Sequence, residues 1–410
     1  MKLPRPSPLS HSLLPLFVLA HFAHHVVTAA TAPLLPLIRD SFSLSYTQAG
    51  LLLSVFSLSY GLAQLPAGWL NDRIGAPLLI FLGIGGVAAG GLLAGLAPSF
   101  SLLLVAQLAM GLCGAGYHPS ATTLISRVTP PERRGSALGI HVTGGSLTYF
   151  AAPLMAAGLA ALWGWRGSIL ALSAPTLALG VGVLVLLRRA SRRDEGLGSR
   201  RDPSPDMAHT ARFWVHLAGF LLLSASSGAL VGSTAGFIPL LAVDRYGFSE
   251  QAAAGLMALV YSGGMWVAPL AGLVADKLGR APLLVASSLL AAPTIYLVPR
   301  LASSGATLYV LLVLLGMFVF IRMPASESFL VTEAPPRARS LLLGVYFLGG
   351  SVGHGVMTPF IGSWTDHGGF VRSFSLVAAL LLAVTLVCGA TLAATGQRRT
   401  DHREGIRARG

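Results

Sequence analysis

Several ionisable side chains lie inside long apolar runs of this 410-residue chain, where burial is costly and a functional role is the default expectation. Among these residues, Glu327 is the only acid inside an apolar run. The full set consists of six histidines, one arginine and one glutamate: His21, His24, His25, His118, His141, His354, Arg322 and Glu327. This set predicts proton or anion chemistry at membrane depth.

Arg322 and Glu327 lie five residues apart, which is off the direct i,i+4 contact along one helix. A buried carboxyl can carry a proton, and an arginine can clamp a carboxylate or a phosphonate. We therefore predict that Glu327 is a proton-carrying site and Arg322 an anion-binding site. The alternative is a structural ion pair between the two residues that fixes their helix.

Three of the histidines are clustered in the first apolar run. His21 is spaced i,i+3 from His24 and i,i+4 from His25, so it can share a helix face with each. With His118 they could form a proton relay, because imidazole titrates near physiological pH, or a site for Zn, Cu, Ni or Fe. We predict substrate or proton handling, with hydrogen-bonded packing and metal binding as the alternatives.

The composition indicates a membrane protein. Of the residues, 54% are apolar and only 10% are charged, and the mean hydropathy is +0.71. Because a helix crosses the bilayer with about 20 mostly apolar residues, we expect twelve transmembrane helices and an all-α membrane protein. The predicted spans are 11–35, 46–70, 77–96, 100–127, 135–161, 167–188, 212–241, 250–275, 281–301, 304–332, 339–364 and 370–394.

The positive charge follows membrane topology. The net charge is +13, but no nucleic-acid recognition motif accompanies it. Of the 28 basic residues, 22 fall at the ends of the chain, in the polar segment 189–211 or in the loops on the same side. This asymmetry predicts that both termini are cytoplasmic. It also predicts four parts: a six-helix bundle 1–188, a cytoplasmic linker 189–211, a second bundle 212–394 and a basic tail 395–410.

The two predicted bundles repeat one another in sequence. The turn from Gly68 to Pro77 returns 204 residues later as the segment from Gly272 to Pro282, and other matched pairs lie 205 residues apart, such as Pro119 and Pro324. Each copy has an even number of spans. The two halves should therefore share one orientation and be related by an axis along the membrane normal, a plan found in secondary transporters.

The turn from Gly68 to Pro77, its repeat from Gly272 to Pro282 and the layout of six plus six helices resemble the major facilitator superfamily across essentially the whole chain. Three further features resemble its fosmidomycin-resistance-type exporters: His21-Phe22, Gly116-Tyr117-His118-Pro119 and the segment from Gly362 to Gly369 with Asp366 and His367. The chain departs from that subfamily at His24-His25, where Asn-Asp is expected. In the fourth helix, Gln107 replaces the arginine of many proton-coupled relatives. That replacement weakens any transfer of the usual coupling residue.

The resemblance implies a cytoplasmic gate at the repeated turns. Asp72 and Asp276 would each face the N-terminus of a helix in the opposite half, which is worth about 0.3–2 kcal/mol. Arg73 and Lys277 would hold these carboxylates, and Gly68 and Gly272 would let two helices approach closely. Of the usual basic pair after the turn, only Arg280 is present, in the second copy. The alternative is a solvated turn that only orients the protein.

The resemblance and the intramembrane residues together predict a transporter that alternates between inward-open and outward-open states. The expected function is proton-coupled export of a small polar or anionic organic compound, including antibiotics. The alternatives are uptake of an organic anion or metal complex and, in a different class, a membrane receptor that transports nothing. No phosphate-binding glycine loop is present, so we expect no enzyme and no cofactor, with a proton gradient as energy source. We expect a monomer in a bacterial-type inner (plasma) membrane that binds no nucleic acid.

Overall fold

The computed structural model describes residues 8–130, 133–191, 210–301, 305–335 and 338–396. Most of the predicted linker and of the basic tail lie outside these residues, so the predicted division into four parts stays a prediction. The surroundings of Gly68 and the side chains of Asp72 and Asp276 also lie outside the described part, although the backbone at all three residues is helical.

Helices make up both halves of the chain. The first half contains α1 (Pro8–Val26), α2 (Thr28–Thr31), α3 (Leu35–Phe42), α4 (Tyr46–Ile74), α5 (Ala76–Phe81), the π-helical segment η1 (Leu82–Gly86), α6 (Val87–Gly95), α7 (Phe100–Gly114), α8 (Tyr117–Val128) and α9 (Arg134–Ser191). The second half contains α10 (Ala211–Gly236), α11 (Ile238–Tyr246), α12 (Glu250–Leu278), α13 (Arg280–Leu301), α14 (Gly305–Glu333) and α15 (Arg339–Thr395).

Two long helices each fold back at a glycine. In α9 the bend is at Gly164, with φ 66°, and in α15 it is at Gly369, with φ 70°. Only glycine adopts such a φ at little cost. The two bends are 205 residues apart, which is the spacing of the sequence repeat.

The predicted all-helical membrane fold is confirmed. Within the described residues, nine helical stretches are long and apolar enough to cross a membrane. Two of them, in α9 and α15, hold two spans each on either side of their glycine bends. With α12 added, these spans make up the twelve that were predicted.

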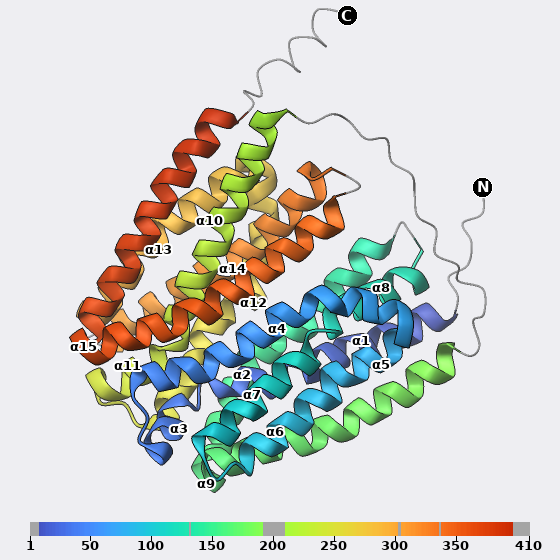
Figure 1. Cartoon of the computed structure of the whole chain (residues 1–410), viewed down its shortest axis with the longest axis horizontal. Helices are drawn as coiled ribbons and strands as arrows, with labels where there is room; N and C mark the ends of the chain where they lie inside the picture. The colour runs from blue at the N-terminus through green and yellow to red at the C-terminus, as the bar shows by residue number, and fades with distance from the viewer. Residues whose placement is uncertain (1–7, 131–132, 192–209, 302–304, 336–337, 397–410) are drawn as a thin grey trace, which may run out of the picture.

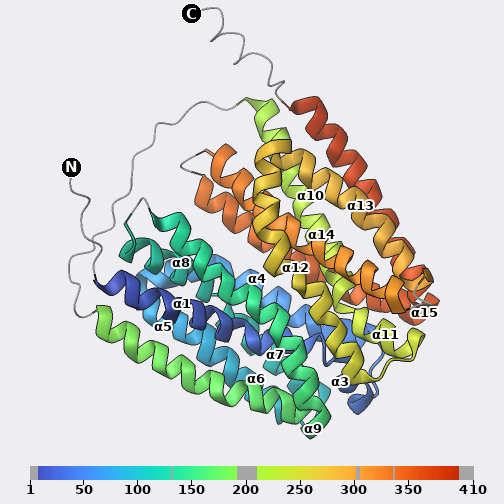
Figure 2. The same ribbon diagram turned by 180° about the vertical axis from the view of Figure 1, so that it is seen from behind.

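The two halves form separate bundles that meet along a seam (Figure 1). Across the seam α4 packs against α15 and α9 packs against α12. Both views show the bundles closest at the end near α3 and α11, while the ribbons separate toward the end where α1 begins and α15 ends (Figures 1 and 2). The two bundles therefore approach each other most closely at one end of the seam.

Side-chain contacts at that end join the two halves. The Arg39 guanidinium makes a two-pronged ion pair with Asp244, with Nη2 2.9 Å from Oδ1. The Tyr46 hydroxyl donates to the same carboxylate over 2.7 Å. The Asp366 carboxylate accepts from the backbone N–H groups of Tyr46 and Thr47 over 2.8 and 2.9 Å. We call these five residues, Arg39, Tyr46, Thr47, Asp244 and Asp366, the cross-half latch.

Asp366 caps a helix of the opposite half. Its carboxylate sits at the first residues of α4, where backbone N–H groups have no partner within the helix and the helix dipole favours negative charge. At the neighbouring ion pair, burial lowers the pKa of the Arg39 guanidinium, but its hydrogen bonds to Asp244 and Asp40 and their negative charges outweigh that effect. The pKa therefore lies above its ordinary value, and the arginine stays charged.

Candidate functional site: a seam cavity between two polar clusters

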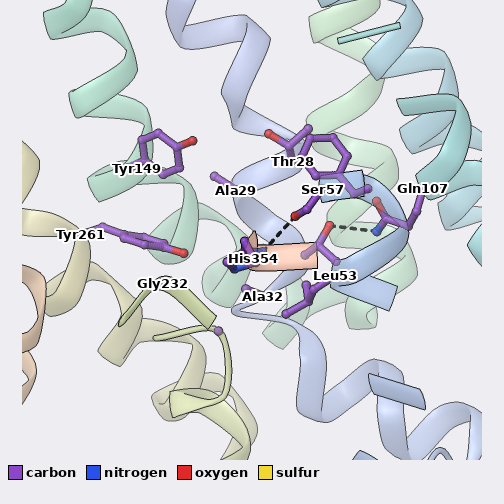
Figure 3. Close-up of a pocket in the computed structure, with 13 residues that line it drawn as sticks. Thr28, Ala29, Ala32, Leu53, Ser57, Gln107, Tyr149, Gly232, Tyr261 and His354 are labelled. Atoms are coloured by element: carbon purple, nitrogen blue, oxygen red, sulfur yellow. Dashed lines mark hydrogen bonds between the residues drawn. The ribbon is translucent and has the colours of Figure 1, made fainter. Parts of the chain in front are cut away.

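A cavity of about 170 Å³ lies at the seam, lined by residues of both halves (Figure 3). Its polar and aromatic lining residues include Thr28, Thr31, Ser57, Gln107, Tyr149, Tyr261 and His354. The cavity therefore suits a small solute with polar groups rather than a long chain.

Two hydrogen bonds fix polar side chains in the cavity wall. Ser57 Oγ on α4 lies 3.0 Å from His354 Nδ1 on α15, across the seam. Within the first half, Gln107 Nε2 donates to Thr31 Oγ1 over 3.4 Å. Of the residues predicted from sequence, Gln107 and His354 line the cavity.

Apart from the cavity, five histidines lie close together inside the first bundle and form a histidine cluster. The ring of His21 lies 5.1 Å from those of His25 and His118 and 4.3 Å from that of His141. His24 lies 4.4 Å from His25 and stacks on Tyr117 at 4.2 Å. The structure thus brings together the four predicted histidines, His141 and Tyr117.

Helix irregularities position this histidine cluster. His24 and His25 come just before the break between α1 and α2, and Tyr117 and His118 begin α8 after the break that follows α7. The π-helical segment η1 faces them, and its Gly83 carbonyl lies 2.7 Å from His24 Nδ1. A π-helical turn often marks a functional site, because it leaves backbone groups free for side chains.

Carbonyl groups of neighbouring helices orient two further rings. His21 Nδ1 lies 2.9 Å from the His141 carbonyl, and His141 Nδ1 lies 3.0 Å from the Phe17 carbonyl. A carbonyl can only accept, so in both residues Nδ1 carries the proton and Nε2 is left as an acceptor. In His141 that Nε2 is buried without a partner among the described residues.

The second bundle holds Arg322. Its Nη1 donates to the Tyr346 hydroxyl over 2.9 Å and lies 3.5 Å from Ser224 Oγ. Gly228 on α10 lies against the guanidinium, because a Cβ added there would be 2.9 Å from Arg322 Cζ. One helical turn further along α10, Gly232 lines the cavity. Arg322 therefore lies about one helical turn from the cavity, with neutral oxygens as partners.

Glu327 is not the ion-pair partner of Arg322. Within the part of the chain that the structure describes, the ion pairs are those of Arg39 with Asp40 and Asp244. Glu327 Oε1 is buried and has no hydrogen-bond partner among the described residues. The structure thus shows no Arg322–Glu327 ion pair among the residues that it describes.

The histidine cluster of the first bundle and the group of Arg322, Tyr346 and Ser224 in the second bundle occupy equivalent places in the repeat. Tyr117 and Arg322 are 205 residues apart, as are His141 and Tyr346. The rings of Tyr117 and His141 are 6.0 Å apart, and Arg322 Cζ lies 5.4 Å from the Tyr346 ring. One ancestral position has thus become an imidazole cluster in one half and an arginine site in the other.

The predicted cytoplasmic gate stays a prediction, because the surroundings of Gly68 and the side chains of Asp72 and Asp276 lie outside the described part of the structure. Arg73 stacks on Trp69, with Cζ 3.9 Å from the ring, and Arg280 Nε donates to Ser328 Oγ over 2.7 Å within its own half. A Cβ at Gly272 would meet no described atom within 4 Å, and Lys277 is exposed.

The sequence-based prediction missed the tyrosines of the cavity and the cross-half latch. Tyr149 is the repeat equivalent of His354, 205 residues before it, and Arg39 and Asp244 are also 205 residues apart. Extending the repeat to these positions could have found three of these residues. For the contact of Asp366 with the start of α4 the repeat offers no such signal, because its equivalent is Ala161.

Comparison with known proteins identifies the family. The model of the Major Facilitator Superfamily matches residues 17–268 and 250–408. The fosmidomycin resistance protein of Escherichia coli strain K12 is 25% identical over 379 residues, which cover 91% of each chain. The probable L-galactonate transporter of the same strain is 31% identical over 151 residues, but the match covers only 37% of this chain and 33% of that protein.

A solved structure agrees with the fold. A bacterial homologue of the human lysosomal transporter Spinster, in an inward-facing and unoccupied conformation, superposes with a TM-score of 0.75 at 19% identity. The match covers 95% of this chain and 97% of that one. The expected fold and family are confirmed, and the chain belongs to the Major Facilitator Superfamily as a multi-pass membrane transporter.

Proposed function

We propose that this transporter couples proton movement to the export of a small organic anion from the cytoplasm across a bacterial inner membrane. The observation that carries this proposal is that Arg322 and Glu327 form no ion pair within the described part of the chain. The guanidinium is held by neutral oxygens of Tyr346 and Ser224, and Glu327 Oε1 is buried without a hydrogen-bond partner among the described residues. A guanidinium held by neutral groups can bind an anion, and a buried carboxyl with one unpartnered oxygen can bind and release a proton.

The position of Arg322 supports an anionic substrate in the seam cavity. Gly228 and Gly232 connect the arginine to the cavity wall beside His354. The relative named for L-galactonate supports the same substrate class, since galactonate is an organic anion. We therefore assign anion binding to Arg322 and proton binding to Glu327.

The cross-half latch supports alternating access. With the termini in the cytoplasm, as the distribution of basic residues predicts, the latch lies on the outer side of the membrane. The structure then corresponds to an inward-facing state. Rocking of the two bundles would break the latch and open the cavity outward, while the turns with Asp72 and Asp276 close the cytoplasmic side.

Export is the direction that we propose, supported by the full-length relative named for resistance to fosmidomycin. Uptake of an organic anion is the second candidate, supported by the name of the L-galactonate transporter. The two directions use the same cavity and differ only in which gradient drives the cycle.

Reconstituted vesicles provide the test. An imposed pH gradient should drive accumulation of radiolabelled galactonate or fosmidomycin by the wild-type protein. Glu327→Gln should abolish gradient-driven accumulation while retaining exchange of substrate for substrate. Glu333→Gln, at the exposed end of the same helix, is the matched control and should behave as wild type. Flux that ignores the pH gradient and is unaltered by Glu327→Gln would refute proton coupling.

A further inference from the structure

We propose that His21, His25 and His118 form a binding site for one divalent transition-metal ion of the zinc, cobalt and nickel class. One ring nitrogen of each histidine lies within 4.8 Å of the others, and this is the group of potential ligands found among the described residues. His21 is buried, and His25 and His118 are partly buried.

The spacing of the three rings matches tetrahedral coordination. A zinc–nitrogen distance of about 2.0–2.1 Å places the ring centre about 3.2 Å from the metal, so three tetrahedral ligands have centres about 5.2 Å apart. The ring centres of His21, His25 and His118 are 5.1, 5.1 and 5.3 Å apart. Ring rotation without movement of the helices would therefore bring the three nitrogens onto one ion.

Neighbouring groups already orient two of the ligands. His21 holds its Nδ1 proton on the His141 carbonyl, which leaves Nε2 for the metal. His25 Nδ1 lies 3.4 Å from the Tyr149 hydroxyl, so its Nε2 is likewise available. Such outer contacts fix the tautomer and the direction of metal-binding histidines.

The donor set selects the class of metal. Three neutral imidazoles suit zinc, cobalt, nickel and copper, whereas magnesium and calcium prefer oxygen ligands. Three protein ligands leave a fourth tetrahedral position open to water or to an anion. The site is in the first bundle, whereas the proposed proton and anion sites are in the second, so either proposal can fail without the other.

Cobalt binding to the purified full-length protein in detergent tests the site, with an affinity tag that contains no histidine. We expect one Co²⁺ per chain with the intense visible absorption of four-coordinate cobalt. His25→Gln and His118→Gln should each weaken binding by more than about 100-fold, because each removes a ligand. His354→Gln, a membrane histidine of the other half, is the control and should bind as wild type. Equal binding by the ligand variants, or no saturable binding by wild type, would overturn the proposal.

A second measurement uses the unmodified protein, in case the histidine variants do not fold. X-ray absorption of the zinc-loaded wild-type protein should show three imidazole nitrogens at about 2.0–2.1 Å. A first shell of oxygen or sulfur with fewer than two imidazoles would place the metal elsewhere and refute the assignment.

Discussion

At the scale of the residue, anion and proton binding are assigned to two ionisable groups of one helix that form no ion pair among the described residues. Arg322 donates to Tyr346, and Glu327 keeps a buried oxygen without a partner among the described residues. A charge-assisted hydrogen bond to an anion is worth about 1.5–3 kcal/mol, more than a neutral one. An arriving anion would therefore gain more from this arginine than a neutral solute of the same size.

Replacing Arg322 should weaken anion binding. We expect Arg322→Gln to raise the Kd for galactonate or fosmidomycin at least about 10-fold, which corresponds to about 1.4 kcal/mol. Arg322→Lys should recover only part of this loss, since lysine cannot bind with two parallel donors. Calorimetry on the purified protein measures both. Arg300→Gln is the control, because Arg300 stacks on Tyr296 away from the cavity. An unchanged Kd for Arg322→Gln would remove the anion assignment.

At the scale of the element, the structure depends on how α4 runs along α15. Glycines allow this contact, since a Cβ at Gly362 would lie 2.3 Å from the Tyr46 carbonyl oxygen. Ser54 Oγ donates to the Gly355 carbonyl over 2.5 Å in the same seam. The N-terminal half of α4 is thus in direct backbone contact with the opposite bundle, and Asp366 caps its first turn.

Removing the cap should favour the outward-open state. Asp366→Ala takes away the acceptor for the first N–H groups of α4, a loss of about 1 kcal/mol, or about 5-fold in the ratio of states. Labelling of a cysteine introduced at the outer mouth, with Cys113 and Cys388 replaced, measures that ratio. Glu333→Gln is the control, because Glu333 lies at the exposed end of α14 and is not part of the cross-half latch. Labelling at the wild-type rate would show that the cap does not hold the closed state.

Two glycine substitutions separate conformational balance from stability. Gly362→Ala introduces a clash across the seam, so it should cost free energy only while the outer side is closed, and labelling should rise. Gly316→Ala would place a Cβ 1.9 Å from the Val260 carbonyl oxygen inside one bundle. Such overpacking costs about 1–3 kcal/mol in either state, so it should lower the melting temperature without changing labelling. The reverse pattern would contradict the assignment of these contacts.

At the scale of the whole molecule, two sets of contacts compete. In the proposed topology the cross-half latch closes the outer side, whereas Asp72 and Asp276 are predicted to close the cytoplasmic side. A change in either set alters the equilibrium between the same two states. Weakening the latch should therefore favour the outward-open state, and weakening the contacts of Asp72 and Asp276 should favour the inward-facing state.

Asp72→Asn tests this opposition. It should shift the population toward the inward-facing state and lower outer-mouth labelling, while substrate preference stays the same. Combined with Asp366→Ala, it should restore a ratio near that of wild type, because effects at distant sites add. A change in which compounds bind would contradict the assignment of Asp72 to the gate.

The sequence predicted the fold well because hydropathy and the repeat constrain it at every span. The bends at Gly164 and Gly369 and the helix ends at Gly75 and Gly279 all follow the repeat. The histidine cluster was also predictable, since His21, His24 and His25 share one helix. The pairing of Asp366 with α4 was not, because it depends on how two bundles dock. Likewise, Arg322 donates to Tyr346 and forms no ion pair with Glu327 among the described residues, which the spacing of the two residues cannot show.

Proton movement driven by substrate is the most direct test of the central claim. Vesicles that contain the transporter and a pH-sensitive dye are given a gradient of galactonate or fosmidomycin and no initial pH difference. For an exporter of the proposed kind, substrate moving down its gradient should drive protons in the opposite direction in wild type but not in Glu327→Gln. Substrate flux without any proton movement in wild type would contradict the account.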